Sequence, residues 1–137
     1  MAQSVSPEYS TELIQAVRRK RILLIDDGEI VRAVVRVFLE EKGFNVCGEA
    51  ADGVEGIEQA KKLQPDLILL DLAMPRMNGV EAAPIISHDL PGIPIILLTI
   101  HDVGKSLATA TGITAVVSKT EGLNTLLECM NSYLRQE

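Results

Sequence analysis

Three short aliphatic runs constrain the fold of this chain more than any other feature of the sequence. They are I-L-L-I at 22–25, L-I-L-L at 67–70 and I-P-I-I-L-L at 93–98. Each is continuously apolar rather than alternating with polar residues, which is typical of strands that are covered on both faces, as in a parallel sheet. Two weaker runs, at 44–47 and 113–117, complete a set of five expected strands.

Segments with helical periodicity lie between and after these runs. The pattern predicts helices over 29–42, 54–63, 79–89 and 121–135, and a weaker one over 102–111, where glycine, serine and threonine dilute the apolar positions. In the first helix the apolar positions are Ile30, Val31, Val34, Val35, Phe38 and Leu39. Strands that alternate with helices indicate an α/β protein built from βα units. We therefore expect a doubly wound (βα)5 domain with a parallel, flavodoxin-like sheet of strand order 2-1-3-4-5.

The chain has 137 residues, enough for one domain with a real core. We expect that domain to span 21–137, preceded by an extension, 1–20, that is either partly helical or frayed. A net charge of −6 argues against direct binding of nucleic acids. The basic run at 18–21 is either a solvated strand entry or a contact patch.

Cysteine usage and hydropathy indicate where the protein works. Cys47 and Cys129 match no metal-binding spacing, so we expect two reduced, half-buried thiols. The N-terminus lacks the pattern of a signal peptide, and the longest apolar stretch is far too short to span a bilayer. The sequence thus favours a soluble, cytoplasmic protein without a membrane partner.

Polar residues follow the expected strands, at the points where those strands end. Asp26 and Asp27 follow the first run and Asp71 the third; Thr99 follows the fourth, and Ser118 and Lys119 the fifth. Taken singly, each has an ordinary explanation: a helix cap, a strand-forming threonine, a solvated lysine. Taken together they lie at the carboxyl edge of a parallel sheet, which is where such folds bind ligands.

Three carboxylates at adjacent strand ends would repel one another and raise one another's pKa. A cation resolves that conflict, and hard carboxylate oxygens suit Mg²⁺. An acid beside Mg²⁺, with a hydroxyl and an ammonium nearby, suits phosphoryl transfer. Asp71 could attack phosphorus and form an aspartyl phosphate, while Lys119 and Thr99 stabilise the phosphoryl oxygens.

With these residues in place, the sequence resembles the receiver domain of response regulators, the phosphoacceptor half of bacterial two-component signalling. The resemblance rests on D-D at 26–27, D-L-A-M-P-R-M-N-G at 71–79, Thr99 and Lys119. It covers about residues 20–136, and E-A-A-D-G-V-E-G at 49–56 also resembles the second βα unit of many receivers.

The resemblance implies a role for each matching residue. Asp71 would be the phosphoacceptor, and Asp26, Asp27, Asp71 and the backbone carbonyl of Ala73 would hold Mg²⁺. Thr99 and Lys119 would sense the phosphoryl group. The donor would be a phosphohistidine on a histidine kinase or a histidine phosphotransfer protein. Output would come through a downstream protein or self-association, by way of 101–112 and 121–135.

Four positions depart from the receiver pattern. Ile100 replaces a small residue, so we expect it to restrict access to Asp71. His101 follows at a position that often tunes dephosphorylation, and is otherwise a solvated loop histidine. Val116 stands where receivers often carry an aromatic switch residue, and Thr120 where a proline commonly follows the lysine, so we expect altered switching and no cis bond after Lys119.

Three functions remain distinguishable from sequence. The leading one is a phosphorylatable receiver that signals through protein contacts and is not a turnover enzyme. The second is a non-phosphorylated, receiver-like interaction module, suggested by Ile100 and Val116. The third, a phosphatase or hydrolase, needs a second acid two residues after the nucleophile, and that position is Ala73. Like Ile100 and His101, Ala73 is a candidate position for tuning access to the site.

Overall fold

A computed structural model describes residues 10, 13, 19–100 and 111–134. It contains five strands: β1 (Arg21–Ile25), β2 (Asn45–Ala50), β3 (Leu67–Asp71), β4 (Ile95–Thr99) and β5 (Ala115–Ser118). All neighbouring pairs are parallel, and the strand order is β2-β1-β3-β4-β5. The predicted doubly wound, flavodoxin-like sheet is therefore confirmed.

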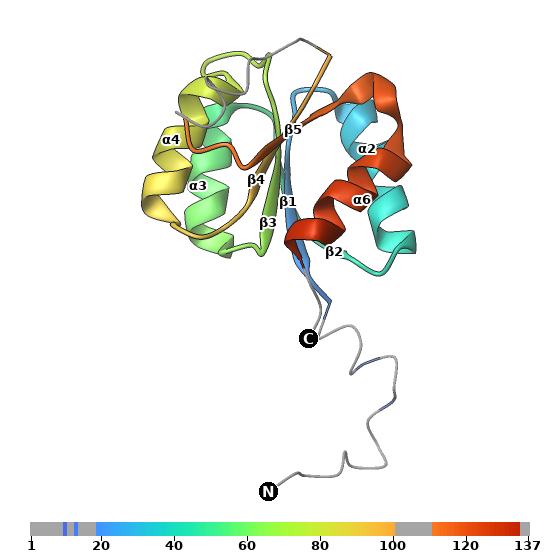
Figure 1. Cartoon of the computed structure of the whole chain (residues 1–137). Helices are drawn as coiled ribbons and strands as arrows, with labels where there is room; N and C mark the ends of the chain where they lie inside the picture. Colours follow the sequence, from blue (N-terminus) through green and yellow to red (C-terminus); the bar gives the residue numbers. More distant parts are fainter. Residues whose placement is uncertain (1–9, 11–12, 14–18, 101–110, 135–137) are drawn as a thin grey trace, which may run out of the picture.

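The helices cover both faces of the sheet. They are α2 (Glu29–Glu41), α3 (Gly53–Leu63), α4 (Gly79–Asp89) and α6 (Leu123–Tyr133), with a short 3-10 helix, η1 (Lys119–Glu121), before α6. Figure 1 shows α3 and α4 on one face and α2 and α6 on the other. All but the last residue of the helix expected over 102–111, and most of the expected extension, 1–20, lie outside the described residues.

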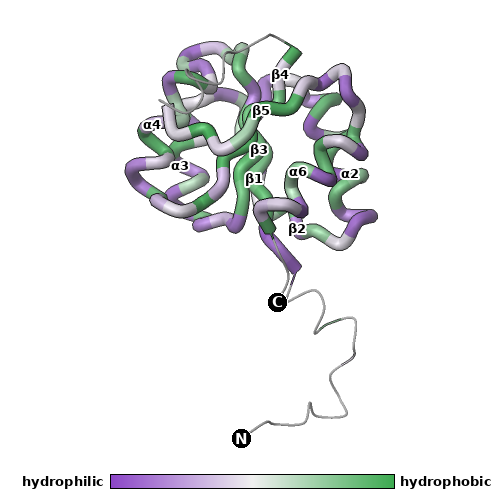
Figure 2. The backbone as a smooth tube through the Cα atoms, viewed as in Figure 1, coloured by the Kyte–Doolittle hydropathy of each residue, from purple (hydrophilic) through white to green (hydrophobic). Residues whose placement is uncertain are grey.

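Two hydrophobic cores, one on each face, explain why the strand runs are continuously apolar. In β1, Ile22 and Leu24 belong to the core beneath α2 and α6, whereas Leu23 and Ile25 belong to the core beneath α3 and α4. Successive side chains of a strand point to opposite faces, so both must be apolar when both faces are covered. The central strands accordingly form a hydrophobic layer between more polar helices (Figure 2).

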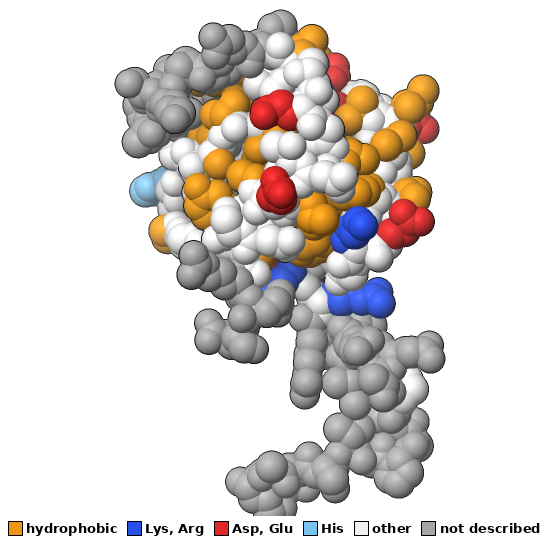
Figure 3. All heavy atoms as spheres, turned by 45° about the vertical axis from the view of Figure 1, so that its right-hand side comes forward, with side chains coloured by type: hydrophobic (Ala, Val, Ile, Leu, Met, Phe, Trp, Pro, Cys, Tyr) orange, Lys and Arg blue, Asp and Glu red, His pale blue; other side chains and the backbone are white. Residues whose placement is uncertain are grey.

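Helix α2 carries more apolar residues than the sheet can cover. Val35 and Leu39 are buried, but Ile30 is 80% exposed, and Val31, Val34 and Val37 are exposed as well. The stripe identified in the sequence therefore contains both core residues and surface residues. Figure 3, which turns the right-hand side of Figure 1 forward, shows hydrophobic side chains gathered on the surface of this side.

Arg21 and the two cysteines have structural environments that can be compared with the sequence predictions. The Arg21 guanidinium donates to the carbonyls of Leu63 (2.7 Å) and Gln64 (3.0 Å) at the end of α3, so this member of the basic run is a structural cap rather than a solvated residue. Cys47 and Cys129 are free and partly buried, as expected, and burial raises the pKa of both thiols. Among the described residues, no helix is long and apolar enough to cross a membrane.

Candidate functional site

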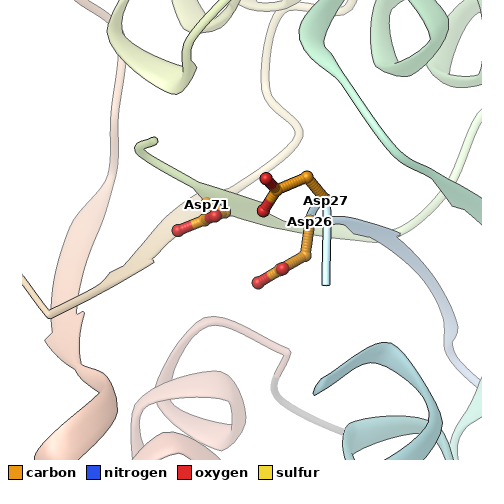
Figure 4. Close-up of side chains that lie close together, drawn as sticks. All are labelled: Asp26, Asp27 and Asp71. Atoms are coloured by element: carbon orange, nitrogen blue, oxygen red, sulfur yellow. The ribbon is translucent and has the colours of Figure 1, made fainter. Parts of the chain in front are cut away.

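The predicted site residues meet at the carboxyl edge of the sheet. Asp71 is the last residue of β3, Asp26 and Asp27 directly follow β1, and Lys119 directly follows β5. Because β1 and β3 are neighbours in the sheet, their ends bring the three acids together. Figure 4 shows the three carboxylates gathered at this edge.

The acids form a tight cluster. One carboxylate oxygen from each of Asp26, Asp27 and Asp71 lies within 4.8 Å of the others. Asp26 and Asp71 are only 7% and 6% exposed, whereas Asp27 is exposed. Water therefore reaches the cluster from the side of Asp27, and the other two carboxylates depend on protein groups for compensation.

Lys119 supplies part of that compensation. Its ammonium nitrogen lies 2.9 Å from Asp26 Oδ2 and 3.2 Å from Asp71 Oδ1. Asp26 Oδ1 in turn accepts a hydrogen bond of 2.8 Å from the backbone N–H of Gly28. Lys119 thus bridges the two buried acids, although it lies 93 residues from Asp26 in the sequence.

The electrostatics show that this compensation is incomplete. Burial raises the pKa of Asp71, the neighbouring Asp26 carboxylate raises it further, and Lys119 offsets only part of the rise. Burial alone would lower the pKa of Lys119, but its bonds to Asp26 and Asp71 raise it, so the ammonium stays charged. One ammonium thus faces three carboxylates, which leaves a net negative cluster.

A short capped turn fixes Lys119. Ser118 and Glu121 form a capping box: the Ser118 hydroxyl accepts from the Thr120 N–H (3.2 Å), and the Glu121 carboxylate accepts from the Ser118 N–H (3.0 Å). The S-x-x-E spacing that is typical of such a cap is visible at 118–121 of the sequence. The described residues contain no cis peptide bond, as the Thr120 substitution led us to expect.

The loop after Asp71 is held by the start of α4. Asn78 caps this helix through a capping box with Glu81. A Cβ atom on Gly79 would lie 2.3 Å from the Asp71 carbonyl oxygen. A left-handed backbone is not the reason for a glycine here, because Gly79 is not among the glycines with positive φ. Glycine is required at position 79 because the start of α4 lies too close to the end of β3 to leave room for a side chain.

The remaining candidate residues occupy different environments. Thr99, at the end of β4, is 1% exposed and lies opposite Ser118 in the strand register. Ile100 is 67% exposed, and its effect on access to Asp71 stays a prediction. Val116 packs against the core beneath α3 and α4. His101 lies outside the described residues.

An open cavity of about 730 Å³ adjoins the acids on the side of Asp27. Ala73 lines it together with Asp27, Leu72, Met74 and Asn78. Solvent therefore reaches the acid cluster from this side, and Ala73 contributes only a methyl group to the lining.

The donor set fits a hard divalent cation. Three carboxylates with oxygens in mutual reach, two of them buried and only partly compensated by Lys119, match the all-oxygen preference of Mg²⁺. Among the residues that the structure describes, no cysteine or histidine belongs to this cluster. The residues present therefore fit the ion that the sequence implied.

Two features of the site were missed from sequence. Arg32 donates to the Asp26 carbonyl oxygen at 2.5 Å and pairs with Glu49 on β2 at 2.8 Å. Beside the site, a cavity of about 270 Å³ lies between α2 and α6, lined by Ile30, Val34, Leu123 and others and reaching Lys119. Hydropathy periodicity does not indicate the contacts of Arg32. The cavity could have been suspected from sequence, because α2 has more apolar positions than one buried face of a helix needs.

Comparison with known proteins places this arrangement in a class. A family model described as the response regulator receiver domain matches residues 22–131. The chain belongs to this family.

The individual relatives agree with this assignment. The response regulator protein VraR of Staphylococcus saprophyticus subsp. saprophyticus is 35% identical over 120 residues, which cover 85% of this chain and 57% of that protein. This chain thus spans little more than half the length of that relative.

Solved structures agree as well. The response regulator domain of Thermotoga maritima CheB has a TM-score of 0.78 and 28% identity, covering 88% of this chain and 99% of that one. A CheY-like receiver domain protein from Methanospirillum hungatei has a TM-score of 0.79 and 26% identity, covering 85% and 94%.

Proposed function

We propose that this receiver domain accepts a phosphoryl group on Asp71 from a phosphohistidine of a histidine kinase or histidine phosphotransfer protein. The observation that carries the proposal is the convergence of three acids and Lys119 on one edge of the sheet. Membership of the family supports the same role. Output would follow through protein contacts with a downstream protein or a second copy.

The chemistry follows from the positions of these groups. A carboxylate oxygen of Asp71 forms the new bond to phosphorus while the bond between phosphorus and the donor imidazole nitrogen breaks, and the imidazole leaves with its electron pair and takes up a proton. Lys119, 3.2 Å from Asp71, lies where it can compensate charge on the phosphoryl oxygens. The buried Thr99 hydroxyl would hydrogen-bond one of them.

Asp26, Asp27, Asp71 and the carbonyl of Ala73 would hold Mg²⁺. When bound, the ion supplies positive charge that neutralises the phosphoryl oxygens. The protein's own contribution is to hold the three carboxylates together and to keep Asp71 shielded. Burial and the Asp26 carboxylate raise the pKa of Asp71. A bound cation would offset the repulsion between the Asp26 and Asp71 carboxylates and so favour the ionised, nucleophilic form of Asp71.

Incubation with Mg²⁺ and acetyl phosphate tests the proposal. We expect the intact chain to gain the mass of one phosphoryl group, and mild base to remove it, as expected of an acyl phosphate. Asp71→Asn should gain nothing. If the wild-type chain gains no mass while remaining folded, the alternative function, an unphosphorylated interaction module, is favoured instead. The exposed apolar residues of α2 would suit such a module.

A further inference from the structure

The side chain of Arg32 connects three separate elements next to the acid cluster. It projects from α2, its NH1 donates to the Asp26 carbonyl oxygen at 2.5 Å, and its Nε donates to Glu49 Oε1 on β2 at 2.8 Å. The side chain is only 16% exposed. A long cationic side chain held at both ends and largely buried has little freedom to move.

The carbonyl that Arg32 contacts has a particular place in the site. The Asp26 carbonyl and the Asp27 N–H belong to one planar peptide unit, so a bond that fixes the carbonyl also fixes the orientation of that plane. The orientation sets the direction in which the chain leaves Asp26 and therefore, together with the side-chain torsion angles, where the two carboxylates point. The Asp26 N–H, on the other side, is bonded to the Ala50 carbonyl at 3.0 Å.

Strand β2 therefore holds the acid pair from two consecutive residues. Ala50 holds the Asp26 N–H directly, and Glu49 holds the Asp26 carbonyl through Arg32. Glu49 is itself fixed by a second arginine, since Arg36 Nε donates to Glu49 Oε2 at 2.7 Å. A small cavity of about 20 Å³ lies against Arg32, Asp26 and Asp71, and aliphatic side chains form the rest of its wall.

We propose that Arg32 is a positioning residue for the acid cluster: by fixing the Asp26–Asp27 peptide plane, it directs the Asp26 and Asp27 carboxylates toward Asp71, and Glu49 holds Arg32 in place. The proposal rests on the function proposed above, because its consequence is a better Mg²⁺ site. Arg32 itself contacts no carboxylate of the three acids among the ion pairs of the described residues.

Arg32→Gln tests this role, and Arg21→Gln is its matched control. Arg21 also donates to backbone carbonyls, those of Leu63 and Gln64, but at the opposite edge of the sheet. By calorimetric titration we expect Mg²⁺ affinity to fall about tenfold or more in Arg32→Gln, as for other groups that orient metal ligands, and to stay unchanged in Arg21→Gln. Equal affinity in both folded variants overturns the proposal.

A second readout needs no metal. In the metal-free protein, the amide resonances of Asp27 and Gly28 should shift in Arg32→Gln and stay in place in Arg21→Gln. If the wild-type chain binds no Mg²⁺ and forms no adduct, the proposed function fails, whereas the amide shifts still decide whether Arg32 orients the loop. Unmoved amides in Arg32→Gln sink the positioning role alone.

Arg32→Lys separates geometry from charge and serves if Arg32→Gln does not fold. A lysine keeps the positive charge but lacks the planar fork that reaches a carbonyl and a carboxylate together. We expect it to lose Mg²⁺ affinity in the same direction as Arg32→Gln. If Arg32→Lys keeps the wild-type Mg²⁺ affinity and the wild-type positions of the Asp27 and Gly28 amide resonances, positioning by the guanidinium is contradicted.

Discussion

Replacement of Gly79 by alanine should damage both stability and the acceptor site. The added Cβ would lie 2.3 Å from the Asp71 carbonyl oxygen, 3.1 Å from the Asp71 carbonyl carbon and 3.1 Å from Leu97 Cδ1. Two of these atoms are backbone, so the clash can be relieved only if α4 or the end of β3 moves. Overpacking of this kind costs about 1–3 kcal/mol of unfolding free energy.

The same movement would displace Asp71 itself. A shift of about 1 Å at a reacting group can cost on the order of 100-fold in rate. Urea unfolding measures the stability loss, and the rate of labelling by acetyl phosphate with Mg²⁺ measures the loss of activity. We expect both to fall in Gly79→Ala.

Gly48→Ala provides the comparison. Its Cβ would meet Leu63 Cδ1 at 2.4 Å, but this is the end of a side chain that can rotate away, and none of the three nearest atoms belongs to Asp26, Asp27 or Asp71. We expect a smaller loss of stability and an unchanged labelling rate. If Gly79→Ala matches the wild type in both measurements, the close approach of α4 to Asp71 does not constrain the site as argued.

Three further predictions follow from the same contacts. Asp27→Asn removes one of three clustered carboxylates, so urea unfolding should show the metal-free chain roughly 1 kcal/mol more stable, with less added stability from Mg²⁺; lower metal-free stability would count against mutual repulsion. Burial alone would raise the pKa of Glu49, but Arg32 and Arg36 hold it below its ordinary 4.5. This ion pairing stabilises the fold above that value and is lost as the pH falls through the lowered pKa, so the stability difference between wild type and Glu49→Gln should shrink in acid; a difference independent of pH refutes this. Asn78→Ala should cost about 1 kcal/mol in thermal or urea unfolding through loss of the α4 cap, and no loss would mean that the capping box is not formed.

Much of the fold was predictable because burial on both faces leaves a direct mark on sequence. Continuous apolar runs identified β1, β3 and β4, and strand-end positions brought Asp26, Asp27 and Asp71 together. Predicting that these acids meet needed no knowledge of side-chain packing, because parallel strands present their carboxyl ends at the same edge of the sheet. The predicted strand boundaries were less accurate. The second strand was expected at 44–47, but β2 extends to Ala50, because Gly48 and Glu49 pair with β1 although neither continues the apolar run.

The features that escaped prediction depend on contacts between distant elements. The Arg32–Glu49 pair joins α2 to β2, and its alignment depends on a register shift between Ile22 and Leu23 that no local pattern reveals. The exposure of Ile30 was not predicted for another reason. Helical periodicity shows which residues share a face of α2, but the packing of α2 beside α6 decides how much of that face is buried. The capping residues Ser118 and Glu121, in contrast, carried a readable signal.

The central claim is that Asp71 accepts the phosphoryl group with the help of a divalent cation. Borohydride reduces an aspartyl phosphate to homoserine, which peptide mass spectrometry locates in the sequence. After treatment with acetyl phosphate, we predict homoserine at position 71 when Mg²⁺ is present and none when Mg²⁺ is chelated. Homoserine at another acidic position, or equal labelling with and without Mg²⁺, would contradict the account.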